Sequence, residues 1–318
     1  MATRNLEVTK YYLTQNRVLR YFVQFWSLLL LNGAVFGFTA TWLTLPINQP
    51  PTQASIADGA FYIMNELIIN VAFPFIPLAM FFLVGAIVGR ALCGWVCPFG
   101  FVQDVLAKIA DIWGRILPLR RRHPTKATNE SWSDLAKFIA GAYILFSVYL
   151  AVTKLIGGSI GVAAANSYGV FATDPVAILD PAATLFVYIP FLLEAEKLPG
   201  MTNAANIWGI DFLGNQFFFW FRILSLFIVI ILCLFIPRAF CRYLCPTGAI
   251  MGKIGQNSLI GVNRNLATCN QCQACEIICP MGVRLLDHGS KLRDSMCINC
   301  GDCVDICDTG ALSIKLET

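Results

Sequence analysis

The sequence predicts an α-helical polytopic membrane protein with four transmembrane helices, followed by a small α+β domain rich in cysteine. Three observations support this: the hydrophobic composition, four long apolar stretches and a concentration of cysteines near the C-terminus. Of the 318 residues, 57% are hydrophobic and 13% are charged, and the mean hydropathy is +0.65. An ordinary soluble domain carries about twice that charged fraction, so much of this chain is expected to be solvated by membrane lipid.

Four apolar stretches reach the roughly 20 residues that a helix needs to cross a hydrocarbon core. They cover residues 21–45, 67–89, 137–156 and 215–236. A fifth patch, residues 182–193, is shorter and contains Pro190, which favours a half-inserted or interfacial segment on the outer side. We therefore expect a membrane domain over residues 1–260 and a cytoplasmic domain over residues 261–318.

Basic residues gather on one side of this predicted topology. Of the 23 Lys and Arg, four precede the first span, eight lie from Arg90 to Lys137 and eight follow Pro237. Cytoplasmic loops retain positive charge, so a multi-pass protein of the cytoplasmic (inner) membrane with both termini on the cytoplasmic side is expected. This distribution explains the net charge of +4, and no nucleic-acid partner is predicted.

The residues that follow the second span predict an interfacial amphipathic helix. Apolar residues recur at helical spacing from Val102 to Ile116, and Asp104 and Lys108 lie among the polar residues between them.

One motif, R-A-Φ-C-x-x-x-C-P-x-G, occurs twice, at residues 90–100 and 238–248. Each copy follows a predicted span, which indicates two hairpins related by a pseudo-twofold axis along the membrane normal. Cysteines at i and i+4 share one helix face, and the proline that follows ends or bends that helix. The four cysteines could then meet as ligands of a third metal centre, most simply an iron–sulfur centre at the membrane boundary. A redox-active thiol pair, metal handling or a buried structural turn are the alternatives. The four cysteines, called the boundary cysteines below, are Cys93, Cys97, Cys241 and Cys245.

Eight further cysteines form two runs with the spacing C-x-x-C-x-x-C-x-x-x-C, at residues 269–279 and 297–307. This is the bacterial ferredoxin pattern, in which three cysteines of a run bind one [4Fe-4S] cluster and the fourth binds the other. Zinc sites usually supply two cysteine pairs instead. The first cysteine set is Cys269, Cys272, Cys275 and Cys307. The second cysteine set is Cys297, Cys300, Cys303 and Cys279.

The surroundings of the second run differ from those of the first. Asp308 stands where Pro280 follows the first run, and Asp302, Asp305 and Asp308 add negative charge. If unscreened, that charge is expected to favour the oxidised state of the neighbouring cluster. The alternative is that the three aspartates form a solvated face. The alternation of apolar and polar residues over 311–316 predicts the closing strand of a small ferredoxin domain.

Other residues exclude several function classes. The two histidines, His123 and His288, lie outside the predicted spans, so a bis-histidine haem inside the bilayer is excluded. The sequence contains no haem-attachment CxxCH, no P-loop and no Rossmann glycine motif. Cys233 is expected only to pack within the fourth span. Arg222 is expected to snorkel toward the outer interface, and the alternative is that it pairs with a quinone headgroup or a loop carboxylate.

Four spans, two CxxxCP motifs and a C-terminal two-cluster ferredoxin together resemble the NapH-type membrane-bound ferredoxin family, with MauN-like proteins and the membrane core of NosR regulators as relatives. The resemblance implies a redox subunit of a membrane oxidoreductase complex of the quinol dehydrogenase type. Electrons would pass between the quinone pool or a redox partner and two [4Fe-4S] clusters, with other subunits, quinone and lipid as partners. The alternative is an accessory or maturation ferredoxin that supplies electrons for assembly of a metalloenzyme or copper site. No catalytic residue is identified from the sequence.

Overall fold

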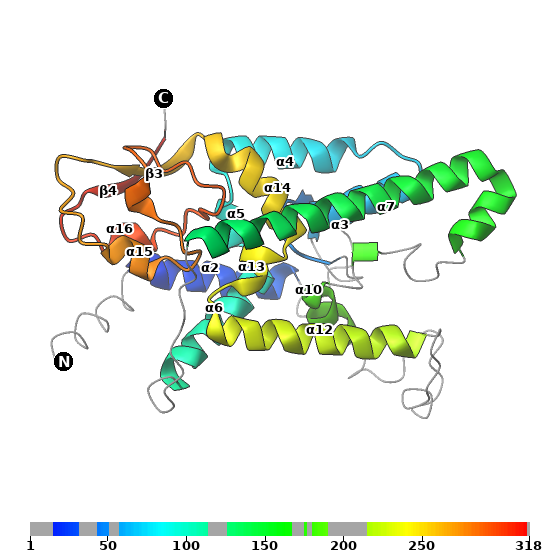
Figure 1. Ribbon diagram of the computed structural model, residues 1–318, viewed down its shortest axis with the longest axis horizontal. Coiled ribbons are helices and arrows are strands. Elements are labelled where there is room, and N and C mark those ends of the chain that lie inside the picture. The colour runs from blue at the N-terminus through cyan, green and yellow to red at the C-terminus, as the bar shows by residue number, and fades with distance from the viewer. Residues whose placement is uncertain are drawn as a thin grey trace.

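The computed structural model describes residues 15–31, 43–50, 57–113, 126–166, 175–176, 180–189 and 215–316. Long helices run side by side, and a small cysteine-rich domain lies at one end of them (Figure 1). The longer helices are α2 (Gln15–Leu31), α3 (Ala60–Ile69), α4 (Phe75–Val88), α6 (Pro98–Trp113), α7 (Lys126–Asn166) and α12 (Asn215–Phe235). Three shorter helices are α5 (Ala91–Trp95), between α4 and α6, and α13 (Ala239–Tyr243) and α14 (Pro246–Ile254), which lead from α12 to the C-terminal domain.

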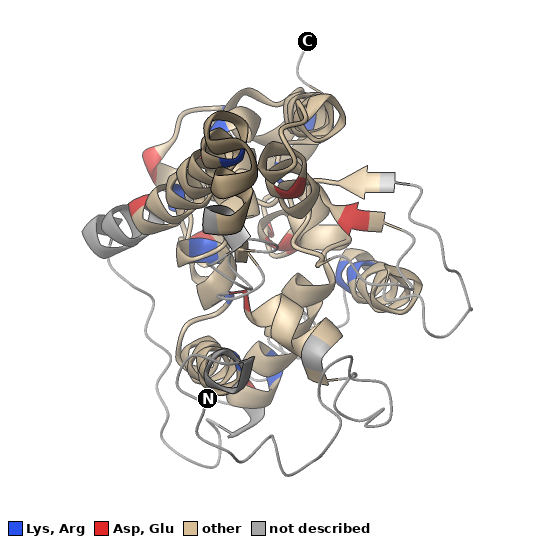
Figure 2. Ribbon diagram, turned by 90° about the vertical axis from the view of Figure 1, so that its right-hand side faces the viewer, with Lys and Arg blue, Asp and Glu red and all other residues tan. Residues whose placement is uncertain are grey.

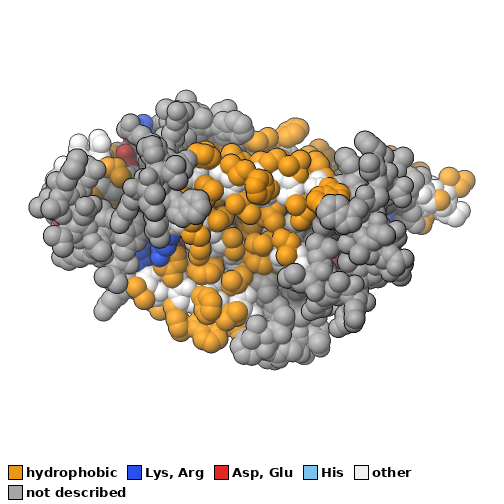
Figure 3. All heavy atoms as spheres, turned by 90° about the horizontal axis from the view of Figure 1, so that it is seen from below, with side chains coloured by type: hydrophobic (Ala, Val, Ile, Leu, Met, Phe, Trp, Pro, Cys, Tyr) orange, Lys and Arg blue, Asp and Glu red, His pale blue; other side chains and the backbone are white. Residues whose placement is uncertain are grey.

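The outer faces of the long helices are strongly apolar. Large hydrophobic side chains are exposed along α2, α4, α7 and α12, including Ile156 and Ile160 of α7 at 81% each. In the end-on view most of the described ribbon is uncharged (Figure 2), and the face seen in Figure 3 carries a broad field of hydrophobic side chains. By length and composition, one helical stretch among the described residues, Asp134–Ala163, suffices to cross a membrane.

The apolar run 67–89 is not one continuous helix, which corrects the predicted second span. Helix α3 ends at Ile69 and α4 begins at Phe75. Val71 adopts a φ of 59°, which is costly for a β-branched residue, and Pro74 cannot donate a helical hydrogen bond. The two helices instead form a hairpin with mutual contacts.

The predicted first span is also shorter as a helix than the sequence indicates. Within 21–45, helix α2 ends at Leu31, residues 32–42 lie outside the described residues, and Leu43–Leu45 form strand β1. Strand β1 pairs in parallel with β2 (Ala57–Gly59), with Thr44 opposite Asp58. A backbone that pairs with a neighbouring strand cannot also continue the helix.

The segments expected outside the membrane pack into the interior of the protein. Ile47 and Ala182 are buried in one apolar cluster with Cys97 and Cys245. Helix α10 (Pro181–Ala183) continues into the π-helix η1 (Thr184–Tyr188), so the described part of the 182–193 patch is a short helical turn with a buried start. Residues 190–193 lie outside the described residues.

The C-terminal domain is built on a two-stranded antiparallel sheet. The short 3-10 helix η3 (Gly255–Asn257) leads into β3 (Ile260–Arg264), which pairs with β4 (Leu312–Leu316). The strand predicted near the C-terminus is therefore confirmed. Between the strands lie α15 (Ala274–Ile278), η4 (Leu285–Asp287) and α16 (Asp302–Asp305).

Candidate functional site

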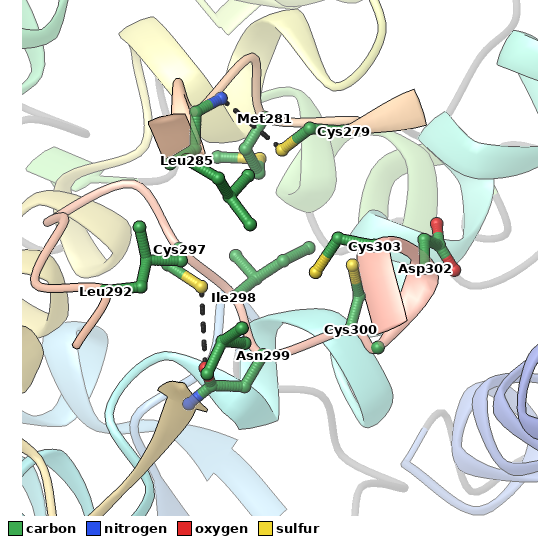
Figure 4. A pocket seen from close by; sticks show the side chains of 13 residues that line it. Cys279, Met281, Leu285, Leu292, Cys297, Ile298, Asn299, Cys300, Asp302 and Cys303 are labelled. Carbon is green, nitrogen blue, oxygen red and sulfur yellow. Dashed lines mark hydrogen bonds between the residues drawn. The ribbon is translucent and has the colours of Figure 1, made fainter. Parts of the chain in front are cut away.

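The second cysteine set surrounds one small cavity in the C-terminal domain. Cys279, Cys297, Cys300 and Cys303 all line it, and most of its other wall is apolar. Their sulfurs point into the cavity, while Asp302 points away from it (Figure 4). Thiols from two separate loops around a dry cavity are the donor set that a [4Fe-4S] cluster requires.

Burial dominates the electrostatics of these thiols. It raises the pKa of Cys297 to about 12. Such a thiol is protonated at neutral pH unless a bound cation compensates its thiolate. Among the described residues, no three His, Cys, Asp or Glu side chains converge as a single metal ion would require. A cube is bound differently, because each cysteine meets a separate iron at a separate corner.

The two cysteine loops share an unusual backbone conformation. Gln271 and Gln273 of the first run have φ values of 55° and 63°, and Asn299 and Gly301 of the second have 47° and 84°. These pairs occupy equivalent positions, two and four residues after the first cysteine of each run. A left-handed backbone conformation is uncommon outside glycine. Its recurrence at equivalent positions indicates that both loops adopt the same conformation to present their cysteines.

The first cysteine set lies closer to solvent. Cys272 is exposed and the other three are half-buried. Cys275 and Cys307 contact the apolar cluster that also contacts the second set, whereas Cys269 and Cys272 do not belong to it. Burial, followed by the charges of Glu276 and Cys272, raises the pKa of Cys275 to about 11.

The boundary cysteines lie at two matching helix junctions. Cys93 belongs to α5 and Cys241 to α13, while Cys97 and Cys245 directly precede α6 and α14. The proline after each second cysteine therefore begins the next helix, where its missing N–H is not needed. The Cys245 sulfur caps α14 by accepting the N–H of Gly248 at 3.3 Å.

The structure brings the two cysteine pairs together. All four are less than 10% exposed; Cys93 and Cys241 share one apolar cluster, and Cys97 and Cys245 share another. Burial, and then the charges of Cys241 and Cys93, raises the pKa of Cys97 to about 12. Burial likewise raises the pKa of Cys241, to about 11. All thirteen cysteines of the chain lie among the described residues, and none of them forms a disulfide.

Two arginines cross between the motif copies. Arg90 donates to the carbonyl oxygen of Cys241 at 3.1 Å, and Arg238 donates to the carbonyl oxygen of Cys93, also at 3.1 Å. Each arginine opens its own motif copy and reaches the first cysteine of the other copy. Two repeats related by a pseudo-twofold axis would make such contacts in reciprocal pairs, as these two arginines do.

Asp104 faces the protein interior, which corrects its predicted place on a polar helix surface. It is 5% exposed and accepts from Arg238 Nε at 2.7 Å. Burial alone would raise the pKa of Asp104, but the adjacent guanidinium outweighs burial and holds that pKa below its ordinary value. The exposed apolar residues Val105 and Ile109 show that α6 turns part of its apolar face outward.

Gln103 was not anticipated from the sequence, although it contacts a boundary cysteine. Its Nε2 lies 3.0 Å from the sulfur of Cys241, and its Oε1 accepts the Cys241 backbone N–H at 3.4 Å. Cys233, expected only to pack, also donates its thiol to Gln103 Oε1 at 3.5 Å. Next to Asp104, Gln103 carries no sequence signal of its own for this role. Gln24, by contrast, is an isolated polar residue in an apolar stretch, and it donates to the carbonyl oxygen of Gly94 at 2.6 Å.

Asp302 is screened, so its charge does not act on the second set as a free carboxylate. Arg20 donates to its Oδ1 at 2.8 Å, and both side chains are almost fully buried. Asp305 accepts from Asn16 at 2.7 Å. The expected electrostatic effect of Asp302 is therefore largely cancelled by Arg20, one of the four basic residues that precede the first predicted span.

Two remaining expectations concern histidine and arginine. His288 lies in the C-terminal domain, 3.4 Å from Asp294, and His123 lies outside the described residues. Arg222 is 4% exposed and so does not extend to the surface as a snorkelling side chain would. Its burial corrects that expectation.

Family models match both cysteine regions. One described as a 4Fe-4S binding domain matches residues 70–121 and 218–265, which contain the boundary cysteines. Another, described as a 4Fe-4S dicluster domain, matches residues 261–308.

Curated relatives carry ferredoxin-type and electron-transport names. The ferredoxin-type protein NapH of Haemophilus influenzae is 27% identical over 83% of this chain and 73% of its own length. The putative electron transport protein YccM of Escherichia coli is 24% identical over 76% of this chain, which spans just over half (55%) of that relative. The methylamine utilization ferredoxin-type protein MauN of Paracoccus denitrificans is 42% identical over 24% of this chain and 27% of its own length. No solved structure matches.

Proposed function

Because the chain belongs to the NapH and MauN group of ferredoxin-type electron-transfer proteins, we propose that it is a membrane-embedded electron relay of the quinol dehydrogenase type. It connects the quinone pool, or another redox partner, with two [4Fe-4S] clusters. The first cysteine set holds one cluster and the second set holds the other. Each cluster supplies a one-electron redox centre when bound, and the polypeptide holds it and sets its surroundings.

The observation that carries this proposal is the direct packing of the boundary cysteines on the ferredoxin domain. Cys93 and Cys241 share an apolar cluster with Met296 and Ile298, which flank Cys297 of the second set. A ferredoxin domain that served only a soluble partner would not need to bury this side. Packed here, it can exchange electrons with the membrane-embedded half of the chain.

A third iron–sulfur centre bound by the boundary cysteines extends the relay toward the membrane. Four buried thiols that lie close together in an apolar core either bind a metal centre or pack as small apolar groups. The 4Fe-4S family model over residues 70–121 and 218–265 favours binding. Arg90 and Arg238, which donate to cysteine carbonyls, would fix the two halves of the site relative to each other.

The proposed topology has four membrane segments with both termini on the cytoplasmic side. The exposed apolar faces of α2, α4, α7 and α12 support contact with lipid. Helix α4 has 14 residues and is thus about 21 Å long at 1.5 Å per residue. Because a hydrocarbon core is about 30 Å thick, the second segment crosses only together with neighbouring structure.

Quinol reduction of the clusters tests the relay. The full-length chain, purified anaerobically with its native partner subunits, is mixed with a short-chain quinol, and reduced-cluster paramagnetism is followed by rapid freezing. The relay predicts that cluster signals form at least as fast as the complex turns over. Failure of quinol to reduce clusters that dithionite reduces would contradict it.

The accessory or maturation role is separated by depleting the chain after its client enzyme has assembled. The relay predicts that client activity falls with the chain. A maturation factor predicts that the activity of the preassembled client persists.

A further inference from the structure

The two cysteine loops have equal spacing and equivalent backbone bends, but their surroundings differ. In the first run, three of the residues that lie between the cysteines are exposed to solvent: Asn270, Gln271 and Gln273. In the second run, Ile298 and Asn299 are buried. One loop is open and the other is covered, and the cover is the helical half of the chain.

The covering contacts are specific and close. A Cβ at Gly94 would lie 2.7 Å from the carbonyl oxygen of Ile298, so only glycine permits this approach. The next residue, Trp95, donates its indole N–H to the carbonyl oxygen of Asn299 at 3.1 Å. Gly94 and Trp95 lie between the boundary cysteines Cys93 and Cys97, so the second loop rests directly on the first CxxxCP motif.

Three further contacts fix the second loop. Arg90 donates to the carbonyl oxygen of Ser295 at 2.8 Å, and Arg20 binds Asp302 from α2. Asn299 donates to the carbonyl oxygen of Val88 at 3.2 Å, at the end of α4. Helices α2, α4 and the first motif thus hold the same short loop from several sides.

We infer that the two clusters act in a fixed order: the cluster of the second set exchanges electrons with the iron–sulfur centre proposed at the boundary cysteines, and the cluster of the first set exchanges them with a soluble one-electron redox protein. The inference rests on the proposed function for its electron flow, but the burial contrast is independent of that function. In each transfer one electron leaves a reduced centre and reduces its oxidised neighbour, with no bond broken.

Solvent access to each cluster tests the order without any quinol. The full-length protein in lipid nanodiscs is reduced with dithionite, and a soluble paramagnetic lanthanide chelate is added. We expect the chelate to speed the spin relaxation of one cluster signal only. Cys272→Ser should remove that signal, and Cys300→Ser should remove the unaffected one. Faster relaxation of the Cys300-dependent signal, or equal effects on both, overturns the inference.

The electron route is tested with quinol on the same variants. In Cys300→Ser, the Cys272-dependent cluster signal should lose its rapid formation with quinol while dithionite still produces it. In Cys272→Ser, quinol should still produce the Cys300-dependent signal. Rapid formation of the Cys272-dependent signal with quinol in Cys300→Ser overturns the order. If quinol reduces neither cluster in the unmodified chain, the proposed function fails, and the chelate experiment alone decides the inference.

A variant outside the cysteines guards against misfolding. Gly94→Leu should force the second loop away from the motif and slow reduction of its cluster by quinol. Gly289→Leu, in the ferredoxin domain at a position with no heavy atom within 4 Å of a Cβ, is the control. Equal reduction rates in both variants contradict the proposed contact route.

Discussion

The two copies of the R-A-Φ-C-x-x-x-C-P-x-G motif carry the same residues in different surroundings. Arg90 and Arg238 both donate to the first cysteine carbonyl of the other copy. Arg238 also donates from Nε and Nη2 to the buried carboxylate of Asp104. Arg90 instead donates to the carbonyl oxygen of Ser295 in the ferredoxin domain. One arginine therefore joins the two repeats, and the other also joins the repeats to the cluster loop.

The residues that follow each motif explain this division. Asp104 and Gly252 occupy equivalent places, four residues after the motif glycine. A Cβ at Gly252 would lie 2.5 Å from the Ser295 carbonyl oxygen, so a carboxylate there would exclude the ferredoxin loop. Divergence at one position thus converts a symmetric repeat into a scaffold with one docking side.

The largest effect on the free energy of unfolding is expected from Asp104→Asn. It leaves the buried Arg238 guanidinium without a counter-charge, which costs about 3–5 kcal/mol of unfolding free energy. Thermal unfolding in detergent measures it. The double variant Asp104→Leu with Arg238→Met should recover most of the loss, because an apolar pair needs no compensation. Failure to recover would indicate that the arginine contact with Cys93 matters more than the charge pair.

An exposed ion pair provides the control for that variant. Lys137 Nζ lies 2.6 Å from Asp134 Oδ1 at the surface, and the side chains of Asp134 and Lys137 are 71% and 50% exposed. Asp134→Asn should change the unfolding free energy by about 1 kcal/mol at most. A loss comparable to that of Asp104→Asn would show that the assay does not distinguish buried from exposed charge.

Acid should remove the contribution of Asp104. Its pKa is held below the ordinary value by Arg238, so its stabilisation is fully present above the unfolded-state pKa of about 3.9. It is lost as the pH falls through the lower, folded-state pKa. The stability difference between the unmodified chain and Asp104→Asn should therefore shrink only below about pH 4. A difference that shrinks near pH 6 would contradict the assigned direction.

Arg90→Met should loosen the ferredoxin domain more than it destabilises the helices. Each hydrogen bond from a charged donor contributes about 1.5–3 kcal/mol, and Arg90 donates to both Ser295 and Cys241. Hydrogen exchange should increase around residues 295–299 and remain near its original level in α7. Unchanged exchange in that loop would refute the docking role of Arg90.

The smallest effect is expected from Gln103→Met, which should slightly lower the reduction potential of a centre at the boundary cysteines. The substitution introduces the residue found at the equivalent position of the second repeat, Met251. Removing the donor to the Cys241 sulfur destabilises the more negative, reduced state of a centre bound there. A loss of about 1 kcal/mol corresponds to a potential lower by about 40 mV for one electron. A redox titration measures the shift, and a higher potential would contradict the assigned hydrogen bond.

The sequence predicts local features well because their spacing reflects local geometry. The cysteine runs and the strand that closes the ferredoxin domain depend on residues within a few positions of one another. The break in the run 67–89 could not be seen in average hydropathy, since Val71 is as apolar as its neighbours. Only Asn70 and Pro74 hint that the helix ends there.

Long-range partners explain the errors. Asp104 looks like a polar surface residue until its partner, 134 positions away in sequence, is known. Arg20 enters the sequence analysis only as one of four basic residues before the first predicted span, yet it neutralises Asp302, 282 positions away. The repeat drew attention to Arg90 and Arg238, but their exchange between copies is a property of the folded chain.

Iron and acid-labile sulfide, counted in the anaerobically purified chain, most directly test whether the boundary cysteines extend the relay. The account predicts about twelve iron atoms per chain for a third cube, or about ten for a two-iron centre, falling to about eight in a Cys97→Ser, Cys245→Ser variant. About eight iron atoms in the unmodified chain, with the same count in the variant, would contradict it.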